Sequence, residues 1–201
     1  MNTKSLGRFA AGFLAATALV AATIALGSSG RDDPPARGAG NFSPYVTKDG
    51  GISRPTDYRD TFEYLGSYAV ATKPDKPLDE MHVVYARPED VRAYRRDGKF
   101  PDGATLVKEV TRVGSERLTT GQSHWAADVK LWFVMIKDSK RFKDEPGNWA
   151  YFSFGHKYPL KAEVSKNAAA ACNQCHQNNA KTDWVFSQYY PVLRAAAPHS
   201  K

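Results

Sequence analysis

The stretch Val129–Ile136 (VKLWFVMI) is apolar at every position except Lys130. Its β-branched and aromatic residues predict a β-strand. Apolar side chains at both odd and even positions predict that both faces of the strand are buried. We therefore expect this strand to be central in a sheet, with neighbours on both sides.

Three further segments have the composition of strands. Met81–Tyr85 and Asn148–Phe154 are rich in β-branched and aromatic residues, and Ala104–Val113 carries a valine at every third position near its end. The polar stretch Gly114–Ser123 separates this last segment from the central strand and predicts a loop. Because the connections are short, the strands are expected to form an antiparallel sheet.

One helix is clearly indicated between the predicted strands Met81–Tyr85 and Ala104–Val113. Pro88 lies where a first helical turn would begin, Glu89 and Asp90 follow it, and Gly98 ends the segment. Acidic residues in the first turn and arginines in the last turn have charges opposite to those of the helix dipole at each end, which favours a helix.

The C-terminal part is expected to be helical. A helix is predicted through Ala168–Ala171, and a short second helix is predicted from Asp183, as its N-cap, to near Pro191. Strands first and helices last predict an α+β fold, a mostly antiparallel β-sheet with flanking helices.

Both cysteines of the chain lie in the run Cys172-Asn173-Gln174-Cys175-His176. The pattern C-x-x-C-H is typical of a covalent attachment site for c-type haem. Each thiol can add to one vinyl group of the porphyrin, and the histidine can serve as proximal iron ligand. We therefore predict one covalent haem c near the C-terminus, attached through Cys172 and Cys175, with His176 as the metal ligand.

Two other interpretations of the cysteine motif stay open. A C-x-x-C pair can be a redox dithiol, usually where a helix opens in a thioredoxin-like fold. It can also be half of a structural zinc site, but such a site generally needs four cysteine or histidine ligands. The other histidines are scattered along the chain: His82, His124, His156 and His199.

The N-terminus predicts export. Residues 1–27 resemble a secretory signal peptide, because Lys4 and Arg8 precede an uncharged, alanine-rich stretch. Haem c is assembled outside the cytoplasm, so export agrees with the cysteine motif and indicates a periplasmic protein. The apolar stretch is close to the minimum for a membrane span, so an uncleaved anchor is the alternative. Residues 28–42 predict a flexible linker, and residues 43–201 predict one haem domain.

The composition narrows the class of partner. A hydrophobic content of 42% indicates a globular chain, and the net charge of +7 is carried mostly by the part after the signal. A basic surface suits a soluble, acidic electron-transfer protein. The basic residues are dispersed and no base-stacking motif is present, so nucleic acid is not expected as a partner.

Three stretches of the chain resemble the cytochrome P-460 family, which also includes the β-sheet form of cytochrome c′. They are residues 102–114 (DGATLVKEVTRVG), 137–150 (KDSKRFKDEPGNWA) and 172–196 (CNQCHQNNAKTDWVFSQYYPVLRAA), with a weaker match near Tyr58. The resemblance implies a mostly antiparallel sheet with helices around it, a homodimer, and a haem held against the sheet.

The resemblance also implies roles for three residues. In cytochromes P-460 a strand lysine is covalently tied to the porphyrin, and Lys108 matches that position; the β-sheet cytochromes c′ lack this crosslink. A distal carboxylate accepts protons when family enzymes oxidise hydroxylamine, and its position falls on Phe133, whose ring cannot accept a proton. A second distal position, an arginine in the family, falls on His82, which can donate a hydrogen bond or bind iron.

Three functions follow from these residues. The first is redox chemistry on a small nitrogen compound, hydroxylamine or nitric oxide, at an open iron site, although Phe133 argues against hydroxylamine oxidation. The second is binding of nitric oxide or another neutral diatomic gas without turnover, which an apolar distal pocket favours. The third is electron transfer, which needs a strong sixth ligand such as His82, Met81 or Met135.

Overall fold

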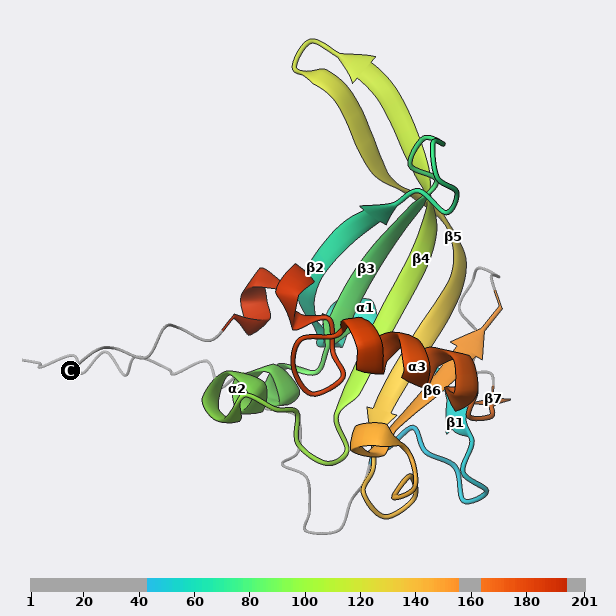
Figure 1. Ribbon diagram of the computed structural model, residues 1–201, viewed down its shortest axis with the longest axis vertical. Helices are drawn as coiled ribbons and strands as arrows, with labels where there is room; N and C mark the ends of the chain where they lie inside the picture. The colour runs from blue at the N-terminus through green and yellow to red at the C-terminus, as the bar shows by residue number, and fades with distance from the viewer. Residues whose placement is uncertain (1–42, 156–163, 195–201) are drawn as a thin grey trace, which may run out of the picture. The chain divides into compact units, whose positions relative to one another are not determined.

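The computed structural model describes residues 43–155 and 164–194 (Figure 1). The predicted signal peptide, or anchor, and the predicted linker lie outside these residues. Among the helices of the described ranges, none has both the length and the apolar character needed to cross a membrane.

A five-stranded antiparallel sheet with the order β2-β3-β4-β5-β6 forms the centre of the fold (Figure 1). Each strand pairs with its neighbour in sequence, so the sheet is a meander. The strands are β2 (Glu63–Val70), β3 (Glu80–Ala86), β4 (Thr105–Leu118), β5 (Gly121–Lys137) and β6 (Trp149–Phe154). The predicted α+β class and antiparallel sheet are confirmed.

Strand β5 has neighbours on both sides, as its sequence predicts. Trp132, Val134 and Ile136 are fully buried on one face of the sheet, in a core that also contains Val107 and Phe152. The intervening positions Phe133 and Met135 point to the other face, where they line a cavity. Both faces of β5 are therefore apolar because each contacts a different apolar layer.

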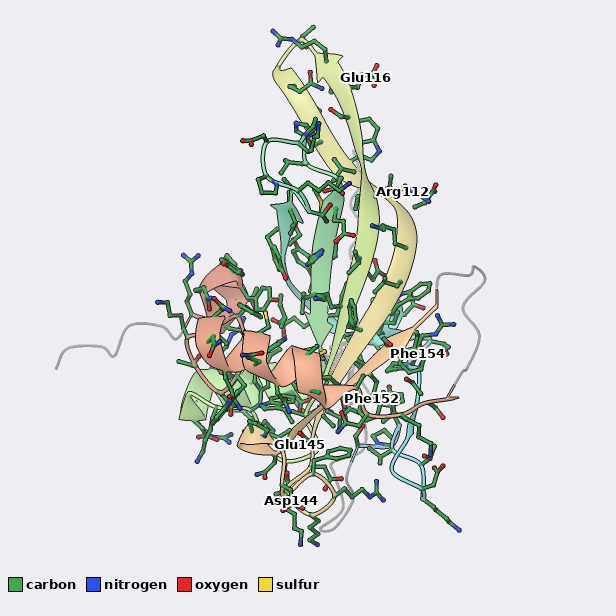
Figure 2. The ribbon with its side chains drawn as sticks, turned by 45° about the vertical axis from the view of Figure 1, so that its right-hand side comes forward. Arg112, Glu116, Asp144, Glu145, Phe152 and Phe154 are labelled. Carbon is green, nitrogen blue, oxygen red and sulfur yellow. The ribbon has the colours of Figure 1, made fainter. Side chains whose placement is uncertain are left out.

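The predicted loop Gly114–Ser123 is wrong. Strands β4 and β5 continue through it as a hairpin whose pairs include Ser115 with His124 and Leu118 with Gly121. This hairpin arm, residues 113–126, projects past the strands that flank it, and Figure 2 shows Arg112 at its base and Glu116 near its tip. The segment is polar because the arm is surrounded by solvent, and not because its backbone is irregular.

The face of the sheet that carries Trp132 is covered by the first described residues of the chain. They form α1 (Tyr58–Thr61) and β1 (Ile52–Ser53), which pairs with β7 (Val164–Ser165). The hydroxyl of the buried Tyr58 donates to Glu109 and accepts a hydrogen bond of 2.8 Å from the indole nitrogen of Trp132. This layer therefore closes one face of the sheet with both apolar and polar contacts.

The opposite face carries helices. They are α2 (Pro88–Asp97), α3 (Ala169–Asn179) and the short 3-10 turns η2 (Ser187–Tyr189) and η3 (Pro191–Leu193); another such turn, η1 (Pro146–Asn148), precedes β6. Helix α2 confirms the prediction at both ends, with Pro88 in its first turn and Gly98 in the left-handed conformation (φ 70°) after its last turn.

The short helix predicted from Asp183 is wrong. Asp183 and Trp184 have φ values of 50° and 56°, in the left-handed region and outside the geometry of a right-handed α-helix, and only the 3-10 turns η2 and η3 follow among the described residues. The Asp183 carboxylate is used for tertiary contacts instead of a cap: it accepts a 2.6 Å hydrogen bond from the backbone of Phe100 and forms a 2.6 Å ion pair with Lys137.

Candidate functional site

A cavity lies between the sheet and helix α3, on the face opposite Trp132. It contains about 850 Å³ of empty space, part of which opens to solvent. All five strands of the main sheet contribute to its wall, through Tyr68, Val84, Leu106, Lys108, Phe133, Met135 and Tyr151. The other wall comes from α3 and the chain after it, through Ala171, Cys172, Cys175, His176, Val185, Phe186 and Tyr190.

The register of the sheet explains this grouping. Val84 pairs with Lys108, which pairs with Phe133, so three side chains from successive strands form one row on the same face. Met135 lies between its partners Leu106 and Tyr151 in a second row. Residues that are far apart in sequence therefore share a wall because antiparallel partners point to the same side.

His176 projects from α3 with a fixed orientation. Its Nδ1 donates a 2.7 Å hydrogen bond to the carbonyl oxygen of Trp184, which leaves Nε2 with its lone pair. The imidazole also contacts the rings of Tyr151 and Phe186, at centroid distances of 4.9 and 4.8 Å. Burial lowers the pKa of His176, so the neutral form that can bind a metal predominates at neutral pH.

The two cysteines lie one turn apart on α3 and are free thiols. Burial raises the pKa of the Cys172 thiol, which is opposite to the lowered pKa of a reactive redox dithiol. Within residues 43–155 and 164–194, no group of three or more His, Cys, Asp and Glu side chains is placed to hold a metal ion. The dithiol and zinc interpretations therefore gain no support from the geometry.

Lys108 extends from the middle of β4 into the cavity. Its Nζ lies 4.6 Å from the centre of the Phe133 ring, and no hydrogen bond or ion pair to it is found among the described residues. Burial lowers the pKa of Lys108, and the nearby thiols of Cys172 and Cys175 oppose that shift only in part. A desolvated amine of this kind is a nucleophile when neutral.

The two predicted distal residues, Phe133 and His82, differ in whether they line the cavity. Phe133 lines the cavity directly. His82 stands next to Val84 along β3, and its Nδ1 lies 2.9 Å from the hydroxyl of Tyr68, which does line the cavity. No Asp or Glu lines the cavity within the described part of the chain, so no other carboxylate of the wall replaces the one that the family resemblance leads one to expect.

Several wall residues were not predicted, among them Tyr68 and Tyr151. Tyr68 lies on β2, a strand that the sequence analysis did not identify. Tyr151 lies in a predicted strand, and its hydroxyl is buried without a hydrogen-bond partner among the described residues. Alternation along β6 was the signal available for Tyr151, because it separates side chains of the cavity face from those of the other face.

Helix α3 is fastened to the sheet by a polar cluster beside the cavity. Glu145, visible at the end of α3 in Figure 2, accepts hydrogen bonds of 2.8 Å from Asn167 and 2.7 Å from Asn173. Asn167 in turn accepts a 3.0 Å hydrogen bond from the backbone of Tyr151. The helix that carries the cysteines is therefore held against β6 at its N-terminal half.

These residues fit a haem group. The cavity wall is mostly apolar, as is usual for cofactor sites, and the hydroxyl of Tyr151, which has no partner among the described residues, offers a polar contact. Two free thiols and an imidazole with an available Nε2 face the same space. This set contains every side chain that the C-x-x-C-H motif requires.

Comparison with known proteins agrees with the resemblance noted in the sequence. A search of curated proteins finds no match to this chain. The family model for Cytochrome P460 matches residues 55–187, a range that includes all five strands of the main sheet, Lys108 and the complete cysteine motif. The chain therefore belongs to the cytochrome P460 family, and this membership implies that it binds haem.

Proposed function

We propose that this protein is an exported mono-haem c cytochrome that carries out redox chemistry on a small nitrogen compound, hydroxylamine or nitric oxide. The observation that carries the proposal is one cavity with Lys108 on its strand wall and Cys172, Cys175 and His176 on its helix wall. Thioether bonds from the two cysteines and Nε2 of His176 would hold the haem, and Lys108 would form a third covalent bond to it. When bound, the haem supplies an open iron position for a small ligand and accepts electrons from it.

The protein side chains define what can enter this site. The carbonyl of Trp184 keeps the His176 ring in one orientation and one tautomer. Leu106, Phe133 and Met135 exclude water and favour small neutral molecules over charged ones.

Binding of a diatomic gas without turnover is the second candidate. It is favoured by the ring of Phe133 in the cavity wall, where the family resemblance leads one to expect a proton acceptor. A phenyl ring can border bound nitric oxide or carbon monoxide, but it cannot itself take a proton from hydroxylamine.

Electron transfer alone has less support. Both ring nitrogens of His82 are engaged, with Tyr68 and with Glu80, so His82 is a poor candidate for a sixth ligand. Met81 alternates with His82 along β3 and belongs to the opposite face of the sheet. Met135 is the remaining predicted ligand, and it does line the cavity.

The proposal includes the setting in which the protein works. The signal-like residues 1–27 support a periplasmic location, with an uncleaved membrane anchor as the alternative. The net charge of +7 supports an acidic, soluble electron-transfer protein as redox partner. The family resemblance supports a homodimer.

The test uses protein matured in a host that assembles c-type haem. We expect an intact mass equal to chain plus one haem, and a colour that survives acid–acetone extraction. A strongly red-shifted ferrous Soret band, lost in Lys108→Ala but kept in Lys130→Ala, would establish the crosslink. Consumption of hydroxylamine with an electron acceptor separates catalysis from gas binding. A colourless chain after maturation would contradict the whole proposal.

A further inference from the structure

A chain of hydrogen bonds leads from the cavity wall toward solvent across neighbouring strands. The hydroxyl of Tyr68 on β2 lies 2.9 Å from Nδ1 of His82, its direct partner on β3. Nε2 of His82 lies 3.1 Å from Oε2 of Glu80, two residues earlier on the same strand. The other oxygen of Glu80 is paired with Lys130.

The ion pair at the outer end depends on an irregularity in β5. Val110 pairs with Leu131 but Thr111 pairs with Val129, so Lys130 is the extra residue of a β-bulge. A bulge redirects the side chain of its extra residue. Lys130 is thereby able to reach Glu80 across β4.

The partners fix the direction of each hydrogen bond. A carboxylate can only accept, so Nε2 of His82 carries the proton and donates to Glu80. Nδ1 then has a lone pair and accepts a hydrogen bond from the Tyr68 hydroxyl. The result is a hydroxyl–imidazole–carboxylate chain whose hydroxyl belongs to a residue of the cavity wall.

The protonation states at neutral pH agree with this assignment. Burial raises the pKa of Tyr68 to about 12 and lowers the pKa of His82, so the phenol is protonated and the imidazole is neutral. Burial would raise the pKa of Glu80, but its contacts with Lys130 and His82 outweigh burial and hold the pKa below its ordinary value. The titratable groups that act on His82 and Tyr68 are Glu80, Lys108, Lys130, Tyr189 and Cys175.

We propose that Tyr68, His82 and Glu80 form the proton acceptor of the cavity, in place of the carboxylate that Phe133 excludes. The inference rests on the proposed redox function. An N–H or O–H proton of the substrate passes to the oxygen of Tyr68 while the Tyr68 proton passes to Nδ1 of His82. The step moves protons and no electrons, Glu80 stabilises the imidazolium, and His82 then releases the proton to solvent.

The arrangement makes a spectroscopic prediction that does not depend on turnover. When the pH falls through the pKa of His82, which lies below 6.5, Nδ1 gains a proton and becomes a donor. Tyr68 must then accept at that hydrogen bond, and its own hydroxyl proton is free to turn toward the cavity. In the carbon monoxide complex of the matured protein, the C–O stretch is therefore expected to shift to lower frequency on acidification.

The test compares infrared spectra of that complex from pH 8 down to the lowest pH at which the protein stays folded. Tyr68→Phe and His82→Gln should each lose the pH-dependent shift. Glu80→Gln should move the shift to lower pH, because the carboxylate that favours the protonated imidazole is gone. Tyr64→Phe, an exposed tyrosine of the same strand, should leave the shift unchanged. If hydroxylamine is oxidised, Tyr68→Phe should lower kcat by about 100-fold or more, with little change in KM.

The outcomes separate the two proposals. A shift present in the wild type and lost in Tyr68→Phe supports the proton acceptor even if no turnover is found, in which case only the redox function fails. A stretch that does not change with pH in the wild type, or a shift that survives Tyr68→Phe, overturns the inference. Turnover that is unaffected by Tyr68→Phe overturns it as well.

Discussion

At the scale of single residues, the axial histidine depends on a turn that its own motif does not contain. The carbonyl that orients His176 belongs to Trp184, in a pair of consecutive residues with left-handed backbone. Asp183 stabilises that conformation through its ion pair with Lys137 and its hydrogen bond to Phe100, and its own carbonyl accepts from Trp149. A sequence motif can identify the ligand, but the turn that orients it is stabilised by contacts with residues distant in sequence.

We expect Asp183→Ala to destabilise the protein strongly. The side chains of Lys137 and Asp183 are only 13% and 7% exposed, so the substitution leaves a buried ammonium without its partner. The free energy of unfolding should fall by about 3–5 kcal/mol. Urea denaturation of the matured protein measures this. Asp97→Ala, which removes an exposed pair with Arg96, is the control and should leave the midpoint unchanged.

At the scale of elements, the strands with strong apolar composition were predicted, whereas strand β2 and the hairpin arm were not. Strand β2 contains Gly66, which lowers its strand signal. The structure explains this glycine: a Cβ there would lie 3.1 Å from the carbonyl oxygen of Tyr189 and 3.3 Å from the ring of Tyr190. A close tertiary contact therefore requires glycine at position 66, although glycine has a low strand propensity and predicts a break in the strand.

The hairpin arm was missed for a related reason. Its glycine, Gly114, lies under the indole of its partner Trp125, and a Cβ at that position would lie 2.3 Å from a ring atom. When only one strand is considered, a glycine of this kind predicts a loop, even though it lies opposite an aromatic residue of the paired strand. The pairing becomes evident only when both strands are considered together.

The arm gives a testable pair of substitutions. Gly114→Ala should lower the free energy of unfolding by about 1 kcal/mol, because the indole must leave its position over the strand. In a Trp125→Ala background the same change should cost nothing, since the obstructing ring is gone. Thermal unfolding of the four proteins of this cycle gives the coupling energy. An equal cost of Gly114→Ala in both backgrounds would disprove the contact.

At the scale of the whole molecule, the two faces of the sheet have different roles. One face packs on a core built around Trp132, Val134 and Phe152, and the other provides most of the cavity wall. The sequence predicted the antiparallel sheet, the cysteine motif and the relation to the family, because each has a local signal. It could not predict the cavity, because that wall takes one or two residues from each of five strands and depends on their register.

Because the core and the cavity lie on opposite faces of the sheet, the structure predicts how the protein behaves without haem. A Cys172→Ala, Cys175→Ala variant cannot attach the group covalently, and the apolar cavity then lacks the contacts that fill it. We expect a lower melting temperature than in the matured protein, with faster hydrogen exchange in α3 and β2. The core around Tyr58 and Trp132 should keep its protection, because its contacts do not involve the cavity. Equal loss of protection on both faces would contradict this independence.

The hairpin arm has a consequence for how such proteins can change in length. The pairing of β3 with β4 ends at Arg112, and the pairing of β6 with β5 begins at Trp132. Among the described residues, the outer parts of β4 and β5 therefore pair only with each other. Two irregularities in the pairing of β4 with β5, one on each side of Thr111, lie between this outer ladder and the part that lines the cavity. Residues can therefore be added or removed in cross-strand pairs near Leu118 and Gly121 without rephasing Lys108 or Phe133, which makes the tip a natural place to graft peptides or affinity tags.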